Sequence, residues 1–374
     1  MGKLVNVNVA LEELRTSNMK SDTPSRPLRI AQIAPLWASV PPATYGGIEL
    51  RLHWLTEELV ARGHDVTLFA SGDSQTSAKL RAGCDYNMMD AMANGAVYQY
   101  ENYVNANVVA ALHASDTFDV IHCHTGCSHI PFSVLSKTPM LHTMPILLSV
   151  DERWLLSRYP DVPVVAISHA QVASVPADRR KHIQVVYHGC DFDRYDLETQ
   201  PGEYLAFLGR MGPRKSPLDA IRIAKAVGMP LVLAGKPQDV DEQCYFNNQV
   251  LPLIDGKQIT YIGPVNHTQK NALLKNARAL IFPIQWEEPF GLVMIEAMAC
   301  GTPVVACNRG SVSEVIDVGK TGFYADTADA LIPLIPQALS LNRQMVRAHA
   351  MTRFSHKRMV DEYLKVYESL AEKA

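Results

Sequence analysis

Two glutamates eight positions apart, Glu288 and Glu296, have the clearest chemical potential in this sequence. Apolar residues recur at helical spacing from about Phe290 onward, and Gly301 can end that helix. The first turn of such a helix offers unpaired backbone N–H groups and the positive end of its dipole, which suit a phosphate. One carboxylate could accept hydrogen bonds from a hexose and the other from a ribose. An acid–base pair is the alternative, although no hydrolytic partner stands beside these carboxylates.

A second anion-binding pattern lies at residues 209–217, between a predicted strand at 204–208 and a predicted helix at 218–227. This loop is glycine-rich and carries Arg210 and Lys215. A strand followed by such a loop and a helix forms a good cradle for anions. We therefore expect both side chains to reach a diphosphate, the alternative being that they are solvated surface charges.

Five histidine or cysteine side chains lie between positions 122 and 129 and suggest a zinc site. Strand alternation, however, points His122 and His124 to one side and Cys123 to the other, and no second cluster supplies further ligands. The preferred interpretation places His124 at the carboxyl end of a parallel strand, facing the crevice where such sheets bind ligands. A histidine satisfied by backbone groups is the remaining alternative.

A β-α-β unit begins at Leu28 and carries Gly46 and Gly47 at the entrance to its helix. Glycines there let a ligand approach free backbone N–H groups. Dinucleotide binding by an oxidoreductase is disfavoured because the loop lacks Gly-x-Gly-x-x-Gly. A turn that simply requires glycine is the other alternative.

These motifs resemble the retaining glycosyltransferases of the large GT-B family, group 1 or family 4, which includes sucrose-phosphate synthases and bacterial mannosyl- and glucosyltransferases. The resemblance is carried by Glu288-x7-Glu296 followed by Ala-Met-Ala-Cys-Gly-Thr-Pro-Val-Val. It extends over nearly the whole chain from Leu28 and is most specific in residues 204–314. It implies an α/β chain with two Rossmann-like doubly wound domains facing across a cleft.

The resemblance also implies roles for individual residues. Glu288 would contact the donor sugar, Glu296 the ribose, and His124 the hexose near its reacting carbon. Arg210 and Lys215 would stabilise the charge that builds on the departing nucleotide. The implied catalytic residues are His124, Arg210, Lys215 and Glu288, and the implied donor-binding residues are Gly46, Gly47, Arg210, Lys215, Val265, Glu288, Phe290, Gly291, Leu292 and Glu296.

Two positions depart from the family pattern. Thr143 is followed by Met144 where relatives often carry a histidine after a threonine, which leaves the acceptor-side chemistry open. His188 replaces the asparagine of a turn that in relatives marks the approach to the domain junction. The identity of the nucleotide base is also undetermined. In relatives the stretch around Val265 binds the base through backbone groups, which are the same for every residue type. We expect a UDP-sugar first, then a GDP- or ADP-sugar.

Composition limits the remaining possibilities. The 374 residues favour two domains, and a net charge of −3 argues against a general nucleic-acid surface. No run is apolar enough to span a membrane, no signal peptide is evident, and seven scattered cysteines fit a reducing compartment, so we expect a cytoplasmic protein. The expected divisions are a flexible extension at 1–27, an acceptor-side domain at 28–198, a donor domain at 199–354, and a last helix at 355–374 that packs back on the first domain.

The predicted function is the transfer of a hexose, glucose or mannose, from a nucleoside diphosphate to a hydroxyl acceptor, and the resemblance implies retention of anomeric configuration. We expect a soluble acceptor, since Lys79 and Arg81 are the only lysine or arginine residues between 71 and 118. No paired aspartates demand a metal, so magnesium can stimulate without being required. The alternatives are a nucleotide-sugar epimerase or hydrolase on the same fold, and a non-catalytic nucleotide-sugar sensor.

Overall fold

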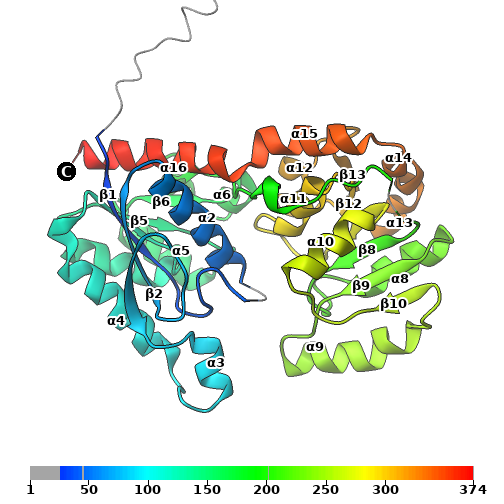
Figure 1. The fold of residues 1–374 in the computed structure, drawn as a ribbon, viewed down its shortest axis with the longest axis horizontal. Helices are drawn as coiled ribbons and strands as arrows, with labels where there is room; N and C mark the ends of the chain where they lie inside the picture. The colour runs from blue at the N-terminus through cyan, green and yellow to red at the C-terminus, as the bar shows by residue number, and fades with distance from the viewer. Residues whose placement is uncertain (1–25, 44–45, 201, 374) are drawn as a thin grey trace, which may run out of the picture.

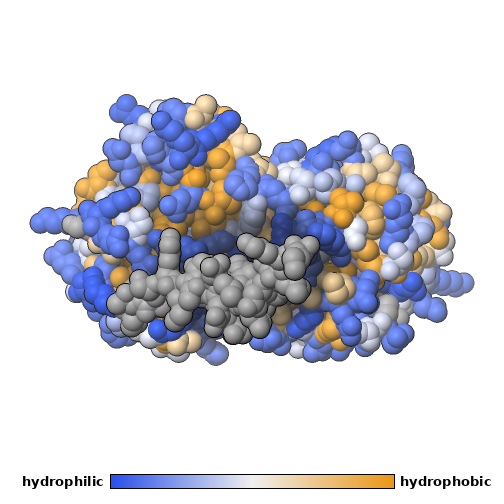
Figure 2. All heavy atoms as spheres, turned by 90° about the horizontal axis from the view of Figure 1, so that it is seen from above, coloured by the Kyte–Doolittle hydropathy of each residue, from blue (hydrophilic) through white to orange (hydrophobic). Residues whose placement is uncertain are grey.

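The computed structural model describes residues 26–43, 46–200 and 202–373. They form two α/β domains side by side, each with one parallel sheet between helices (Figure 1). This arrangement confirms the predicted GT-B class of fold. Seen from above, the domains form two lobes whose mostly hydrophilic surfaces are broken by hydrophobic areas (Figure 2). The predicted N-terminal extension lies outside the described residues apart from its last two positions.

The first sheet has seven strands in the order β3-β2-β1-β4-β5-β6-β7, all paired in parallel. Its central strands are short apolar runs buried on both faces, as parallel sheets require. The strand order reverses direction between β1 and β4, and ligands bind at such a switch point. The strands are β1 (Arg29–Ile33), β2 (Asp65–Ser71), β3 (Lys79–Cys84), β4 (Val120–Cys123), β5 (Met140–Thr143), β6 (Val164–Ala166) and β7 (Gln184–Val185).

Helices cover both faces of this sheet. The longest are α2, which follows the glycine pair, and α4, which leads into β4. The elements are α2 (Gly47–Ala61), α3 (Met88–Ala93), α4 (Tyr100–His113), η1 (Ser115–Thr117), η2 (Cys127–Leu135), α5 (Val150–Arg158), α6 (His169–Ala173), α7 (Ala177–Arg180) and η3 (Phe192–Arg194).

The second sheet repeats the same topology with six strands in the order β10-β9-β8-β11-β12-β13. Its switch point lies between β8 and β11, so the loops after these two strands share one edge of the sheet. Those loops carry Lys215 and Glu288. The strands are β8 (Leu205–Leu208), β9 (Leu231–Ala234), β10 (Ile259–Tyr261), β11 (Ala279–Phe282), β12 (Val304–Cys307) and β13 (Gly322–Ala325).

The helices of the second domain include α11, the helix predicted to begin near Phe290, which begins at Leu292. The predicted helix at 327–339 is divided into three short pieces, with prolines at the starts of the second and third. The elements are α8 (Pro217–Ala226), α9 (Val240–Tyr245), η4 (Phe246–Val250), η5 (Leu251–Leu253), α10 (His267–Asn276), α11 (Leu292–Ala299), α12 (Val312–Val315), α13 (Ala328–Leu331), η6 (Ile332–Leu334) and α14 (Ile335–Leu339).

The chain ends in two consecutive helices, α15 (Arg343–Phe354) on the second domain and α16 (His356–Ala371) on the first. Figure 1 shows them running end to end along the top of both domains. Met359, Val360 and Tyr363 of α16 join the buried core around Leu28 and Ile30 of the first sheet. The last helix therefore completes the first domain. Among the described residues, none of the helices has the length and hydropathy to cross a membrane.

Candidate active site

Two helix N-termini from different domains face each other at the junction of the domains. Helix α2 begins at Gly47 and α11 at Leu292, and neither has a side-chain cap. A Cβ atom on Gly47 would lie 3.2 Å from Cδ1 of Leu292, so the two ends approach closely. Helix N-termini present N–H groups and the positive ends of their dipoles, which suit an anion, although the Glu49 carboxyl also lies in the first turn of α2.

Gly291 sets the direction from which the chain enters α11. Its φ of +77° lies in the left-handed region, and a Cβ atom there would come within 2.5 Å of Met294 Cε and 3.3 Å of Glu288 Cγ. Only glycine satisfies this turn without displacing neighbouring side chains. Gly291 thus determines how Glu288 and the first turn of α11 lie relative to each other.

Lys215 and Glu288 meet above the switch point of the second sheet. Lys215 Nζ forms an ion pair with Glu288 Oε2, and the indole N–H of Trp286 donates to the same oxygen at 3.0 Å. The ammonium also lies 5.3 Å from the ring centre of Phe282 and 5.1 Å from that of Trp286. A cation held by two rings and a carboxylate is preorganised for a negatively charged ligand.

Arg210 follows β8 at the same edge of the sheet. Its Nη1 donates to Gln238 Oε1 at 2.7 Å and lies 3.5 Å from Glu242 Oε1. These partners connect the guanidinium to the segment after β9. Its remaining N–H groups can still donate to a ligand, so the predicted contact of Arg210 with a diphosphate stays a prediction.

Glu296 is buried in the second turn of α11. It accepts hydrogen bonds from Lys270 Nζ at 2.8 Å and from the Tyr195 hydroxyl at 3.1 Å. Burial alone would raise the pKa of Glu296, but the charges of Lys270 and Arg51 outweigh it and hold that pKa below its ordinary value. Glu296 is therefore ionised and can accept hydrogen bonds from hydroxyl groups of a ligand.

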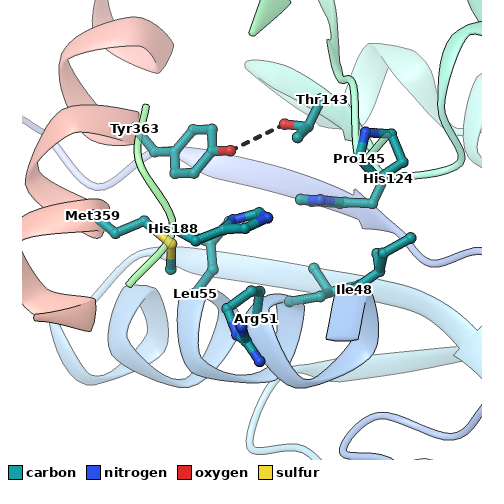
Figure 3. Close-up of a pocket in the computed structure, with 10 residues that line it drawn as sticks. Ile48, Arg51, Leu55, His124, Thr143, Pro145, His188, Met359 and Tyr363 are labelled. Atoms are coloured by element: carbon teal, nitrogen blue, oxygen red, sulfur yellow. Dashed lines mark hydrogen bonds between the residues drawn. The ribbon is translucent and has the colours of Figure 1, made fainter. Parts of the chain in front are cut away.

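His124 follows β4 at the switch point of the first sheet. Its Nε2 lies 2.6 Å from Gln32 Oε1, and burial lowers its pKa to about 3. The ring lines a cavity of about 20 Å³ between α2 and α16 (Figure 3). This volume holds a single water molecule. His124 is thus a neutral hydrogen-bonding group at the inner wall of the junction between the domains.

The other predicted donor-binding residues occupy less open positions. The Phe290 ring is buried 5.2 Å from His188 and 5.9 Å from Phe354, so only its backbone remains for a ligand. Val265 lies after β10 and packs against the core of the second domain. Gly46 is tightly enclosed, since a Cβ atom there would meet Pro42 at 2.7 Å.

Sequence reasoning missed several residues of this region. Arg51 and His188 line the same cavity as His124, and Lys270 and Tyr195 hold Glu296. Arg51 gave one usable signal, because it is a charged residue on the apolar face of α2, beside Leu52 and Leu55 in the cavity wall. Lys270 gave none, since α10 reaches Glu296 only through the tertiary fold.

The histidines and cysteines after β4 do not come together as a metal site. Cys123 Sγ lies 3.0 Å from Thr125 Oγ1, whereas His122 and His124 stack with ring centres 3.8 Å apart on the other side of the strand. In the part of the chain that the structure describes, there is no group of three or more side chains able to hold a metal ion. The predicted alternation along this strand is confirmed.

The two parallel sheets, each in a separate α/β domain, form a fold of the GT-B type found in glycosyltransferases. The Glycosyl transferase 4-like domain model matches residues 46–210, and the Glycosyl transferases group 1 model matches residues 193–373. Together the two models extend over most of the described chain. The chain belongs to the group 1 glycosyltransferases and is an enzyme of that family.

Individual relatives agree with this assignment. An uncharacterized glycosyltransferase of Methanocaldococcus jannaschii is 25% identical over 351 residues, covering 83% of this chain and 89% of its own. The structure of AviGT4, a glycosyltransferase involved in avilamycin A biosynthesis, is 26% identical with a TM-score of 0.70, covering 93% of this chain and 99% of its own. Anabaena HepE, solved with UDP and glucose, is 18% identical with a TM-score of 0.69, covering 91% of this chain and all of its own.

Proposed function

We propose that this glycosyltransferase moves a hexose from a nucleoside diphosphate to an acceptor hydroxyl with retention of anomeric configuration. The observation that carries the proposal is the approach of the N-termini of α2 and α11. That site suits a diphosphate. Glu288, the partner of Lys215, lies in the segment that enters α11, and Glu296 lies within α11 itself. The donor would therefore extend from Glu296 at its ribose to Glu288 at its sugar.

Lys215 is proposed to change partner when the donor binds. Its ammonium pairs with Glu288, and a diphosphate would offer two negative charges at the same position. Glu288 would then be released to accept hydrogen bonds from the hexose. The cation would offset the charge that develops on the leaving phosphate, the kind of interaction that contributes most to catalysis in transfer reactions.

Retention is proposed to proceed by a front-face path. The C–O bond to the leaving phosphate breaks, the acceptor oxygen bonds to the same face of the sugar carbon, and the acceptor proton passes to a phosphate oxygen. The motif residues include no evident nucleophile from the chain, since the proposal assigns Glu288 to hydrogen bonds with hydroxyl groups of the hexose. His124 would contact the hexose through a neutral ring and would not act as an acid.

UDP-glucose is the first donor to test, because a structural neighbour was solved with UDP and glucose. GDP-mannose and ADP-glucose follow, since the family reads the base through backbone groups near Val265. The acceptor is proposed to be a soluble hydroxyl compound. Magnesium is proposed to be stimulatory at most, so EDTA should leave transfer measurable.

The test is an incubation of the full chain with each donor and a panel of hydroxyl acceptors. Release of the nucleoside diphosphate should depend on one acceptor, and the proton NMR coupling of the new anomeric centre should show the donor's configuration. An inverted product would overturn the retaining path. Donor consumption that yields only a free or altered sugar, with every acceptor present, would instead favour a hydrolase or epimerase.

A further inference from the structure

Behind His124, buried side chains form a continuous chain of hydrogen bonds that passes through Tyr367 of helix α16 and reaches Thr143 of β5. Gln32 Oε1 lies 2.6 Å from His124 Nε2, and Gln32 Nε2 lies 3.0 Å from the Tyr367 hydroxyl. That hydroxyl lies 2.6 Å from His122 Nδ1, and His122 Nε2 lies 2.7 Å from Thr143 Oγ1. The side chains of the three central members have no exposed surface, so the chain is shielded from water.

The orientation of the Gln32 amide gives this chain a direction. An amide oxygen only accepts, so the hydrogen of the neutral His124 ring must be on Nε2. The amide nitrogen donates to Tyr367, whose hydroxyl then donates to Nδ1 of His122. His122 in turn donates from Nε2 to Thr143. One amide orientation therefore determines the tautomer of both histidines.

Both histidines carry a single ring hydrogen. Burial lowers the pKa of His124 to about 3 and the pKa of His122 well below its ordinary value. The two rings also lie 3.8 Å apart, where two positive charges would repel strongly. Since Nε2 of His124 is directed at Gln32, the nitrogen that remains for a ligand is Nδ1, which has a free lone pair in this tautomer. Figure 3 shows the ring directed into the cavity between α2 and α16.

We propose that Gln32 and Tyr367 are positioning residues that hold His124 in its Nε2–H tautomer, so that Nδ1 accepts a hydrogen bond from a hydroxyl of the transferred sugar. The identity of this ligand rests on the proposed function, whereas the tautomer does not. Tyr367 follows Gln32 by 335 residues, so the last helix of the chain is part of the sugar site. In this account α16 orients the ligand-facing histidine as well as covering the first sheet.

The reverse donor–acceptor direction along these hydrogen bonds predicts a different role for His124. If the Gln32 amide were turned over, every bond along the chain would reverse, and His124 would carry its hydrogen on Nδ1. His124 would then donate to the sugar instead of accepting from it. The two arrangements use the same atoms, and nitrogen chemical shifts of the ring distinguish them.

The first experiment measures side-chain ¹⁵N shifts of the full chain labelled at histidine, near pH 7.5. The His124 signals are assigned by their loss in His124→Gln. We expect one neutral species with its hydrogen on Nε2, and a mixture of tautomers in Tyr367→Phe. A wild-type ring protonated at Nδ1 would overturn the proposal, as would an unchanged tautomer in the variant. Neither readout requires a donor or activity.

The second experiment compares binding of UDP-glucose and UDP by titration calorimetry. Tyr367→Phe should weaken UDP-glucose binding on the order of 10-fold, which is about 1.4 kcal/mol, and leave UDP binding unchanged because UDP has no sugar. Equal loss for both ligands, or no loss for either, would contradict the positioning role. If the wild-type protein bound neither ligand, the assignment of UDP-glucose as the donor would fail. The ¹⁵N measurement would still test whether Gln32 and Tyr367 determine the His124 tautomer.

Two further variants control for damage to the fold. Tyr204→Phe also removes a tyrosine hydroxyl, which donates to the Leu273 carbonyl at 2.9 Å in the other domain, and it should leave the His124 shifts and both affinities unchanged. Gln32→Met removes the acceptor beside His124 while keeping similar volume, and it serves if Tyr367→Phe does not fold. Gln32→Met should also allow His124 to populate both tautomers. If the His124 ring carried its hydrogen only on Nε2 in both folded variants, the proposal would be overturned.

Discussion

At the scale of single residues, Lys215 is the group that most directly links the structure to the reaction. Its ammonium lies against two aromatic rings and pairs with Glu288. A diphosphate bound beside Lys215 can therefore replace Glu288 as the partner of an ammonium that is already in position. Arg210 differs, because it donates to Gln238 and has no carboxylate of the motif as its partner.

Replacing Lys215 tests this difference. Lys215→Ala should lower kcat by about 10²-fold or more, with a smaller change in KM, because the lost charge matters most as the phosphate departs. Lys225→Ala, an exposed substitution on α8, is the matched control and should retain wild-type rates. Steady-state nucleotide release measures both, and a Lys215 variant with wild-type kcat would remove this residue from the catalytic set.

Glu296 is predicted to act in binding. Glu296→Gln keeps the size of the side chain but removes the charge that faces Lys270, so UDP should bind about 10-fold more weakly by calorimetry. The turnover at saturating donor should change less. Glu203→Gln, at an exposed position before β8, provides the control. Equal UDP affinity in wild type and Glu296→Gln would show that the ribose lies elsewhere.

The residues that the sequence could predict are those within one motif. Glu288 and Glu296 share a short segment, and Lys215 lies in one glycine-rich loop, so spacing alone indicated them. Lys270 and His188 reach the site only because α10 and the end of the first domain fold against α11. Their positions depend on tertiary packing, which local sequence pattern does not encode.

At the scale of elements, α12 of the second domain caps α6 of the first. The Glu314 carboxylate accepts the backbone N–H groups of His169 at 2.7 Å and Ala170 at 2.6 Å, and the Tyr187 hydroxyl at 2.9 Å. The first N–H groups of a helix lack partners of their own, so this side chain satisfies α6 across the domain boundary. The two domains are thereby joined by a polar contact as well as by α15 and α16.

Removal of the Glu314 contact should destabilise the packing of α12 against α6 between the two domains. Glu314→Ala should lower the free energy of unfolding by about 1–3 kcal/mol, because two N–H groups and one hydroxyl lose their acceptor. Urea denaturation measures the change. Asp178→Ala, in the first turn of the exposed α7, should cost much less. Equal losses for the two variants would mean that Glu314 contributes only an ordinary helix-end charge.

Sequence pattern predicted the buried strands well and the exposed edge poorly. The strand predicted at 204–208 corresponds to β8 at Leu205–Leu208, and the unit predicted to begin at Leu28 starts one residue before β1. Strand β3 was missed because this edge strand is mostly exposed and has no apolar alternation. Helix α15 was also missed, since its buried positions include Arg343, which donates to backbone carbonyls instead of packing as an apolar residue.

At the scale of the whole molecule, buried neutral histidines predict sensitivity to acid. Burial lowers the pKa of His124 and of His142 to about 3, and those of His122 and His188 also fall well below 6.5. Between about pH 3 and 6.5 the unfolded chain therefore binds more protons than the folded one. The free energy of unfolding must decrease as the pH falls through this interval.

Each histidine contributes up to about 1.4 kcal/mol per pH unit. The melting temperature should accordingly be nearly constant above pH 7 and fall steeply below pH 6. Thermal melts from pH 8 to pH 5 measure this. Replacing exposed His113 by glutamine should leave the dependence of the melting temperature on pH unchanged. A wild-type melting temperature that stayed constant down to pH 5 would show that protonation of the buried histidine rings costs little free energy.

The two-domain fold could be predicted because each domain repeats alternating strands and helices, which favours a parallel doubly wound sheet. The relative placement of the domains could not be derived from that alternation. It depends on Gly47 approaching Leu292, on the Glu314 contact, and on the crossing of α16 back to β1 and β4. The first two are contacts between residues far apart in the sequence that only the folded chain shows, whereas the return of the last helix was expected from the resemblance.

The most direct test of the central claim is a thermal-shift comparison of the full chain with UDP-, GDP- and ADP-sugars. A donor present at 100 times its dissociation constant adds about 2.7 kcal/mol to the free energy of unfolding, which should raise the melting temperature by several degrees. The account predicts such a shift with one donor, UDP-glucose first, and its loss in Glu296→Gln. No shift with any nucleotide sugar would contradict a donor site between the N-termini of α2 and α11.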